Sequence, residues 1–178
     1  MEKSTVNGVL IEIKQGNIIE QPDVDAIVNA ANAQLQTGGG VAGAIHRVGD
    51  PELRQETKKL APIQTGEAVI SSAPNFPNSH IIHVLGPVYG RDKPERELLA
   101  SCFYETLKLA DQYEIESLAF PAISTGAFGY PLREAAEVSV GTVMESVRQL
   151  SNVKRIRFVL FSKSDAELFR QVLNEQGS

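Results

Sequence analysis

The sequence predicts an α/β fold in which a mostly parallel β-sheet is covered by helices on both faces. Apolar segments of strand length alternate along the chain with longer segments of helical periodicity, an order that is typical of parallel sheets with crossover helices. No linker or internal repeat interrupts this alternation, and 178 residues is close to the usual size of one domain. We therefore expect a single domain over residues 1–178.

The expected strands are short apolar runs. The run at 26–29 is apolar enough to be buried on both faces of a sheet. In chain order, strands are expected at 9–13, 26–29, 67–71, 80–85, 117–120 and 155–161. Disorder is expected only at the two ends of the chain, residues 1–7 and 174–178.

The first expected helices follow the second strand. Apolar residues recur at i, i+3, i+4 and i+7 over 41–48, which predicts an amphipathic helix. These residues are Val41, Ala44, Ile45 and Val48. Pro51 is a favoured first-turn residue and indicates the start of a second helix.

Three further helices are expected in the second half of the chain. One covers 95–113, and the next carries a single apolar stripe along its length. That stripe consists of Leu132, Ala136, Val140, Val143, Val147 and Leu150. The last helix is expected to end near residue 174, and Ser164 and Glu167 have the spacing of a capping box at its start.

Composition and charge restrict the possible functions. Hydrophobic residues make up 42% and charged residues 22% of the chain, as in soluble globular proteins, and no segment approaches the length of a membrane span. The single cysteine, Cys102, suits a reducing compartment, so we expect a cytoplasmic protein. A net charge of -5 argues against sequence-independent nucleic-acid binding. An anionic ligand is therefore expected to meet mainly backbone N–H groups and helix N-termini.

A glycine-rich loop follows the expected strand at 26–29. Ligands of such sheets bind beyond the C-terminal strand ends, and here Gly38, Gly39 and Gly40 stand directly before the first expected helix. Glycine permits positive φ and a close approach of ligand to backbone, and N–H groups at a helix start bind anions. A merely flexible connection is the alternative interpretation.

A second loop of small residues follows the expected strand at 117–120. It contains Ser124, Thr125, Gly126, Ala127 and Phe128 and again leads into a helix. Either loop alone is weak evidence for a ligand. Two such loops at neighbouring strand ends could hold a diphosphate from both sides.

Other nucleotide and catalytic motifs are absent or misplaced. No G-x-x-x-x-G-K-[ST] motif occurs, and eight residues separate Asn29 from the G-x-G-x-x-G match that starts at Gly38, too many for a Rossmann fingerprint. His80 and His83 are three apart on an expected strand and cannot share a metal, and Cys102 falls on the apolar side of a helix. We expect no metal, no cofactor and no covalent serine or cysteine nucleophile.

Four segments together resemble the macrodomain family. They are the Val-Asp-Ala-Ile-Val-Asn-Ala-Ala-Asn stretch at 24–32, the glycine loop and helix at 38–46, His83 with Gly86 and Pro87, and the loop at 123–131. The resemblance covers nearly the whole chain in family order and spacing. It implies a three-layer α/β/α sandwich with a mixed, mostly parallel central sheet that binds ADP-ribose across its C-terminal edge.

The resemblance also assigns roles to residues at each end of the ligand. Asn17, followed by Ile18, stands where the family usually has an acid that accepts from the adenine amino group, and an amide oxygen can still accept. Phe161 matches an aromatic residue that stacks on adenine, an interaction worth roughly 1–3 kcal/mol; a core-edge residue is the alternative. Asn32 would contact the distal ribose, which Phe128 would cover.

The expected diphosphate site lies between the two loops. The residues implied by the resemblance are Gly38, Gly39, Gly40 and Val41 on one side and Ser124, Thr125, Gly126, Ala127 and Phe128 on the other. The partner implied is ADP-ribose or a macromolecule that carries mono-ADP-ribose. The sequence does not indicate an oligomeric state.

One departure from the family pattern concerns catalysis. MacroD-type hydrolases have an aspartate that positions the attacking water, where this chain has Ala42, as viral and some archaeal or animal macrodomains do. A hydrolase of mono-ADP-ribose esters, 1″-phosphate or O-acetyl derivatives is expected to rely on Asn32, assistance from His46 and the ligand's own phosphate. A reader module that binds ADP-ribose without cleaving it is the alternative.

Overall fold

The computed structural model describes residues 1–177, in which seven strands form one mixed sheet. In chain order the strands are β1 (Glu2–Val6), β2 (Val9–Gln15), β3 (Ala26–Ala30), β4 (Ala68–Ser72), β5 (His80–Val84), β6 (Ser117–Phe120) and β7 (Arg155–Leu160). Across the sheet their order is β1-β2-β7-β6-β3-β5-β4. The five central strands are parallel, and β1 and β4 pair antiparallel at the two edges. The predicted mixed, mostly parallel sheet is confirmed.

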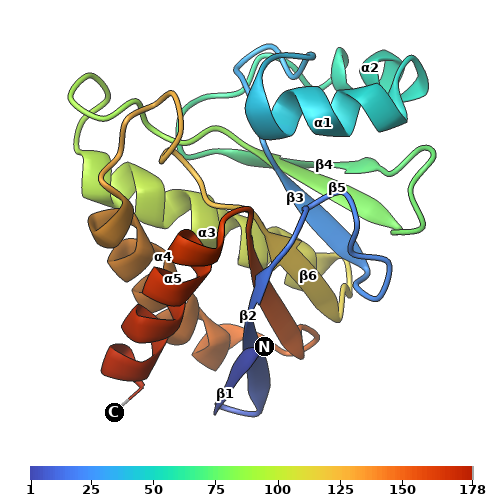
Figure 1. Cartoon of the computed structure of the whole chain (residues 1–178). Coiled ribbons are helices and arrows are strands. Elements are labelled where there is room, and N and C mark those ends of the chain that lie inside the picture. The colour runs from blue at the N-terminus through green and yellow to red at the C-terminus, as the bar shows by residue number, and fades with distance from the viewer. Residues whose placement is uncertain (178) are drawn as a thin grey trace.

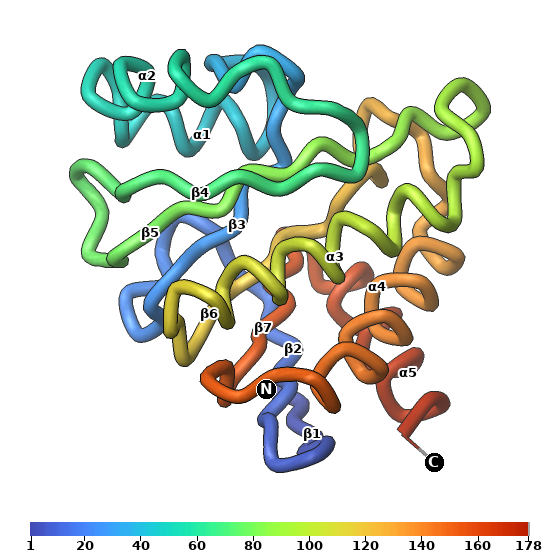
Figure 2. The backbone as a smooth tube through the Cα atoms, turned by 180° about the vertical axis from the view of Figure 1, so that it is seen from behind, coloured from blue at the N-terminus to red at the C-terminus, as the bar shows by residue number. Residues whose placement is uncertain are grey.

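Helices cover both faces of this sheet. They are α1 (Gly40–Gly49), α2 (Glu52–Thr57), α3 (Glu95–Gln112), α4 (Leu132–Ser146) and α5 (Lys163–Gln176), with a short 3-10 helix at Val147–Gln149. Helices α1 and α2 lie on one face, and α3, α4 and α5 lie on the other (Figures 1 and 2). The expected three-layer α/β/α sandwich is therefore correct. None of the helices described in residues 1–177 is both long and apolar enough to span a bilayer.

Strand β3 explains why each face of the sheet has a core of its own. Successive strand residues point to opposite faces of the sheet, and both Ile27 and Val28 are fully buried. Val28 packs in the large core beneath α3, α4 and α5, whereas Ile27 packs with Ile45 of α1 and Leu53 of α2. The continuous apolar run of this strand thus reflects burial on both faces, as its sequence predicts.

The N-terminal residues form a strand, so the expectation of disorder at 1–7 is wrong. Strands β1 and β2 pair from Glu2 opposite Ile13 to Val6 opposite Val9. Asn7 and Gly8 form the two-residue turn between them, with φ angles of 54° and 80°. An Asn-Gly pair with two positive φ angles matches the twist of a hairpin, and this signal is present in the sequence.

The start and end of the last helix also differ from the prediction. Ser162, not Ser164, is the N-cap of α5, and its Oγ accepts from the backbone N–H of Asp165 at 3.1 Å. The helix continues to Gln176, so disorder is wrong for the residues up to that point, while Ser178 lies outside the described residues. Leu150 lies beyond the end of α4 but still packs against the large core.

A buried arginine anchors the loop between β2 and β3. Arg157 of β7 donates to both carboxylate oxygens of Asp23 at 2.8 and 2.7 Å and to Glu12 at 3.2 Å. The guanidinium holds the pKa of Asp23 well below its usual range, first through these hydrogen bonds and then through its charge. Arg157 also donates to Gln21, whose amide donates to the backbone carbonyl of Asn17. This chain of contacts fixes Asn17 at the C-terminal end of β2.

Candidate functional site

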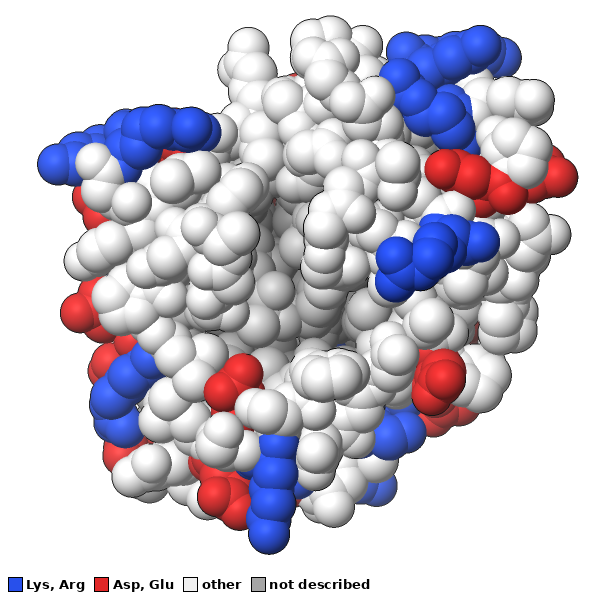
Figure 3. Space-filling model, turned by 45° about the horizontal axis from the view of Figure 1, so that its top comes forward, with Lys and Arg blue, Asp and Glu red and all other residues white. Residues whose placement is uncertain are grey.

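A pocket of about 740 Å³ opens at the C-terminal edge of the parallel strands. Figure 3 shows this hollow in the middle of the face, bordered mainly by uncharged residues. Volumes of roughly 300–1,000 Å³ are typical of small-molecule sites. Every predicted site residue except His46 lines it, namely Asn17, Ile18, Asn32, Gly38, Gly39, Gly40, Val41, Ser124, Thr125, Gly126, Ala127, Phe128 and Phe161.

One wall is the glycine loop and the start of α1. Gly39 is the N-cap and has no side-chain capping hydrogen bond, and Gly40 has φ of 56°. The first N–H groups of a helix have no intrahelical partner. Since the first residues of α1 line the pocket, their N–H groups are available to a ligand there. A Cβ on Gly43 would lie 2.3 Å from the carbonyl oxygen of Gly38. The loop therefore folds directly onto the helix, and this contact requires glycine at position 43.

The opposite wall is the loop after β6. The N–H of Tyr130 donates to the carbonyl of Ser124 at 2.9 Å, which closes the loop on itself. Ser124 has a φ of 68°, an uncommon value for a residue with a side chain. Its buried Oγ has no hydrogen-bond partner in residues 1–177, and a Cβ on Gly86 would lie 2.2 Å from it. The absence of a side chain at Gly86 thus lets the loop after β5 approach this wall. At Gly126 the space is open, since no neighbour lies within 4 Å of the position of a Cβ.

An exposed aromatic ring stands at one end of the pocket. Phe161 follows β7 directly and is 84% exposed, which is incompatible with a core-edge role. Asn17 lies at the same end, and its Oδ1 accepts from the backbone N–H of Ile19 at 3.2 Å. Ile18 is buried in the smaller core beneath it. A flat, apolar surface beside amide groups suits a heteroaromatic base.

Asn32 lies on the glycine-loop side, where its side chain is held by local hydrogen bonds. Its Nδ2 donates to the Gln36 carbonyl at 2.7 Å, and its Oδ1 accepts from the Gln36 N–H at 3.1 Å. A Cβ on Gly38 would lie 3.2 Å from the Asn32 Nδ2. The amide keeps one N–H and one lone pair for a ligand hydroxyl.

The structure does not bring His46 to the pocket. Its ring is buried in α1, its Nδ1 lies 2.8 Å from the Asp50 carboxylate, and its Nε2 has no partner among the described residues. The expected assistance from His46 is therefore not a direct contact, because helix α1 turns this side chain into the protein. Ala42, one turn earlier on the same helix face, does line the pocket and offers only a methyl group.

His83 belongs to the buried polar residues behind the pocket. Its Nδ1 lies 3.1 Å from the Asn29 Nδ2, and its Nε2 lies 2.8 Å from the Ser71 Oγ. Burial lowers the pKa of His83 to about 3, and the neighbouring His46 adds to this effect. His83 is thus a neutral structural residue. In the part of the chain that the structure describes, no group of three or more His, Cys, Asp or Glu side chains could hold a metal ion.

Two charged pocket residues escaped the sequence analysis. Among the described lining residues, Arg47 and Asp165 alone carry ionisable side chains. Arg47 shares the pocket face of α1 with Gly40 and Ala44, a helical spacing that could have identified it. Asp165 stands in the first turn of α5, four residues after Phe161. An anion in this pocket therefore meets backbone N–H groups and a single cation, as expected from the sequence.

Comparison with known proteins decides the family. A sequence model of the Macro domain matches residues 28–139, more than half of the chain. The chain belongs to the macro domain family.

Relatives of this macrodomain are similar over nearly their whole length. A macro domain-containing protein of Caldanaerobacter subterraneus is 45% identical, over 93% of this chain and 96% of the relative. An O-acetyl-ADP-ribose deacetylase of Salmonella typhimurium is 42% identical, over 94% and 96%. A solved mutant of the Oceanobacillus iheyensis macrodomain with ADP-ribose has a TM-score of 0.93 and 34% identity, and the match covers 98% of this chain and 97% of that one.

Proposed function

We propose that this macrodomain binds ADP-ribose in the pocket at the sheet edge and hydrolyses esters of its distal ribose. The observation that carries the proposal is the pairing of two loops rich in N–H groups, one on each side of a pocket that has Phe161 at one end. The relatives named as O-acetyl-ADP-ribose deacetylases and the similar macrodomains solved with ADP-ribose support the same ligand and reaction class.

In this proposal each end of the pocket recognises a different part of the ligand. Adenine stacks on the exposed ring of Phe161, and Asn17 and the half-buried Asp165 lie close enough to the same end to accept from its amino group. The diphosphate lies against the N–H groups of Gly38–Val41 and Ser124–Phe128. Its two negative charges need no cationic cradle, because helix N-termini and loop N–H groups bind anions.

The proposed reaction is the attack of a water molecule on the anomeric carbon of the distal ribose. The water oxygen forms a bond to that carbon, the bond from the carbon to the ester oxygen breaks, and the carboxylate leaves with the bonding electrons. The proton released by the water passes to an oxygen of the ligand's own diphosphate. Asn32 holds the ribose hydroxyls, and Phe128 covers the ribose and keeps bulk water away.

Ala42 sets the expected rate. Positioning of water and ribose supplies on the order of 7–11 kcal/mol at best, whereas one general base typically contributes ~10²–10⁴-fold. Since the methyl group of Ala42 cannot accept a proton, this macrodomain keeps the contribution of positioning and lacks that of a protein base at this position, leaving only the weakly basic diphosphate as the proton acceptor. We therefore expect slow turnover of esters with a good leaving group.

A reader module is the second candidate function, and Ala42 is the observation that favours it. A protein that only recognises ADP-ribose on another molecule needs the same pocket but no base beside the distal ribose. Binding alone therefore cannot separate the two functions, and the decisive measurement is turnover.

The test is release of ADP-ribose from a protein that carries mono-ADP-ribose on glutamate. We expect slow release by the wild type, loss of release in Asn32→Ala, and faster release in Ala42→Asp, which adds a carboxylate beside the distal ribose. Calorimetry with ADP-ribose is measured in parallel for all three. No release by the wild type with intact binding would identify a reader, and no binding at all would overturn the proposed ligand.

A further inference from the structure

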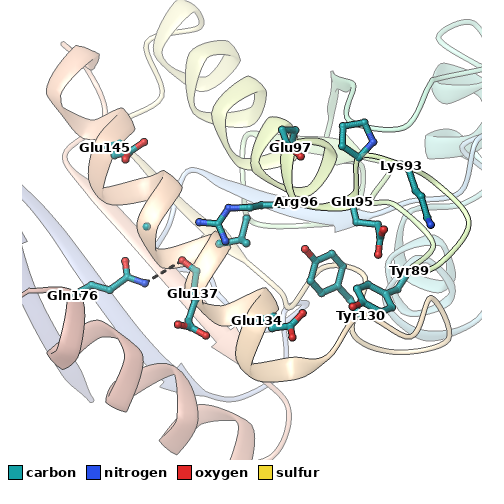
Figure 4. Close-up of a pocket in the computed structure, with 13 residues that line it drawn as sticks. Tyr89, Lys93, Glu95, Arg96, Glu97, Tyr130, Glu134, Glu137, Glu145 and Gln176 are labelled. Atoms are coloured by element: carbon teal, nitrogen blue, oxygen red, sulfur yellow. Dashed lines mark hydrogen bonds between the residues drawn. The ribbon is translucent and has the colours of Figure 1, made fainter.

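A second groove lies beside the ADP-ribose pocket, between the first turn of α3 and one side of α4. Its volume is about 1030 Å³, and it is lined by the segment 93–97, by successive turns of α4 and by Gln176 at the end of α5 (Figure 4). The sequence analysis did not identify this region, because its acidic residues are scattered over 95–145 and form no motif.

The groove is strongly acidic. Five glutamates line it, against Lys93 and Arg96 as the cations, and the glutamates are Glu95, Glu97, Glu134, Glu137 and Glu145. Glu97, Glu134 and Glu145 are exposed and have no ion pair or hydrogen bond within residues 1–177. Carboxylates of two helices therefore outnumber the cations that face the same groove, and the local field favours a cationic ligand.

Tyr130 provides a second, independent indication of a ligand. It is only 5% exposed, and its ring packs against Tyr89 with a centroid separation of 4.9 Å. The ring is buried, but the hydroxyl reaches the groove and has no hydrogen-bond partner among the described residues. Figure 4 shows it pointing into the groove. The hydroxyl is thus oriented for a partner that this chain does not supply.

A backbone hydrogen bond joins the lining of the groove to the lining of the ADP-ribose pocket. The N–H of Tyr89 donates to the carbonyl of Phe128 at 2.8 Å, and Phe128 lines the pocket at the end assigned above to the distal ribose. A side chain that carries ADP-ribose leaves the pocket at the distal ribose. The residues that flank it on the modified protein then pass over Phe128 toward Tyr89 and Tyr130.

We propose that the acidic groove binds a lysine- or arginine-containing segment next to the modified residue, so that this macrodomain selects ADP-ribosylated proteins with basic flanking sequence. The cationic side chains would pair with Glu97 and Glu134 across the groove and contact the rings of Tyr89 and Tyr130. Arg96 lies between Glu97 and Glu137 (Figure 4), and the five glutamates still outnumber it and Lys93. The carboxylates are spread along two helices and form no metal-binding group, which suits an extended segment with several charges. This inference rests on the proposed function.

The test compares two peptides that carry ADP-ribose through a linkage resistant to hydrolysis, one with flanking lysines and arginines and one with flanking serines. Dissociation constants are measured by fluorescence anisotropy at low ionic strength for the wild type, for Glu97→Gln with Glu134→Gln, and for Tyr130→Phe. The matched control is Glu114→Gln with Glu116→Gln, which removes the same charge from exposed positions between the C-terminal end of α3 and the start of β6. The groove, by contrast, is lined by the N-terminal turn of α3.

The wild type and the control are expected to bind the basic peptide about 5–10-fold more tightly than the neutral one, since exposed ion pairs each contribute a small factor. The preference should disappear in the double glutamine variant, fall in Tyr130→Phe, and weaken in 0.5 M salt, while the affinity for free ADP-ribose stays unchanged. Equal binding of both peptides by the wild type, or an equal preference in the double variant, overturns the groove assignment alone. Failure of the wild type to bind free ADP-ribose overturns the proposed function itself.

Discussion

Gly43→Ala tests how the glycine loop is held against α1, because two physical effects predict opposite results. Gly43 lies within helix α1, and alanine is about 1 kcal/mol more favourable than glycine in a helix. Propensity by itself would make this substitution stabilising. The added methyl carbon, however, would lie 2.3 Å from the carbonyl oxygen of Gly38, which is backbone and cannot rotate away.

The contact should outweigh the propensity. Restoring a normal carbon–oxygen separation requires Gly38 to move by roughly 1 Å, and overpacking of this kind costs about 1–3 kcal/mol. Taking the upper part of that range and subtracting the helix gain leaves a net destabilisation of about 2 kcal/mol, or roughly 4–8 °C in Tm for a chain of this length. Loss of one charge-assisted contact from the displaced loop should also weaken ADP-ribose binding by at least about tenfold.

Thermal unfolding and calorimetry with ADP-ribose measure the two effects separately. Gly141→Ala is the matched control, since it also places alanine in a helix but meets only the flexible end of Gln176, at 3.0 Å. The control should keep its Tm or gain a few degrees and retain the affinity of the wild type. If Gly43→Ala behaves like Gly141→Ala in both measurements, the tight contact between loop and helix is refuted.

Three further predictions concern the pocket and the residues behind it. Phe161→Ala should weaken ADP-ribose binding by about 5–150-fold, the equivalent of roughly 1–3 kcal/mol of stacking, with little effect on Tm because the ring is 84% exposed; equal losses for ADP-ribose and ribose-5-phosphate in calorimetry would contradict the adenine role. Gly126→Glu should abolish ADP-ribose binding while circular dichroism shows an intact fold, because the site of its Cβ is free of protein neighbours and a carboxylate there would face the diphosphate; unchanged affinity would remove this loop from the site. The folded protein keeps His83 neutral until its pKa of about 3, whereas the unfolded chain takes up this proton near pH 6.5. Stability should therefore decrease as the pH falls from about 6.5 toward 3, and the His83 ring resonances should not shift between pH 7 and 5; a titration midpoint near 6.5 in NMR would contradict its burial.

The order of strands and helices, and the two loops that form the pocket, follow from the sequence. Periodicity and glycine placement are local properties, so the apolar run of β3 and the glycines before α1 could be identified without any tertiary contact. The same local chemistry contains the Asn7-Gly8 hairpin, which the prediction of a disordered N-terminus overlooked. The signal for the N-cap at Ser162 is also local, but Ser162 and Ser164 both stand near the start of α5, and the sequence analysis chose Ser164.

Other properties of the site depend on distances between segments that are far apart in the chain. The orientation of α1 against β3 buries His46 and leaves Arg47 in the pocket, although both residues stand next to each other on one predicted helix. The need for glycine at position 86 arises from its approach to Ser124, thirty-eight positions later. The acidic groove exists only because α3 and α4 pack side by side. The sequence by itself determined the elements and the composition of the pocket loops, because backbone preferences and periodicity act over a few residues. Tertiary packing decided which side chains reach the ligand, which are buried and which charges share a groove. These properties depend on contacts between distant segments, and no local pattern encodes such contacts.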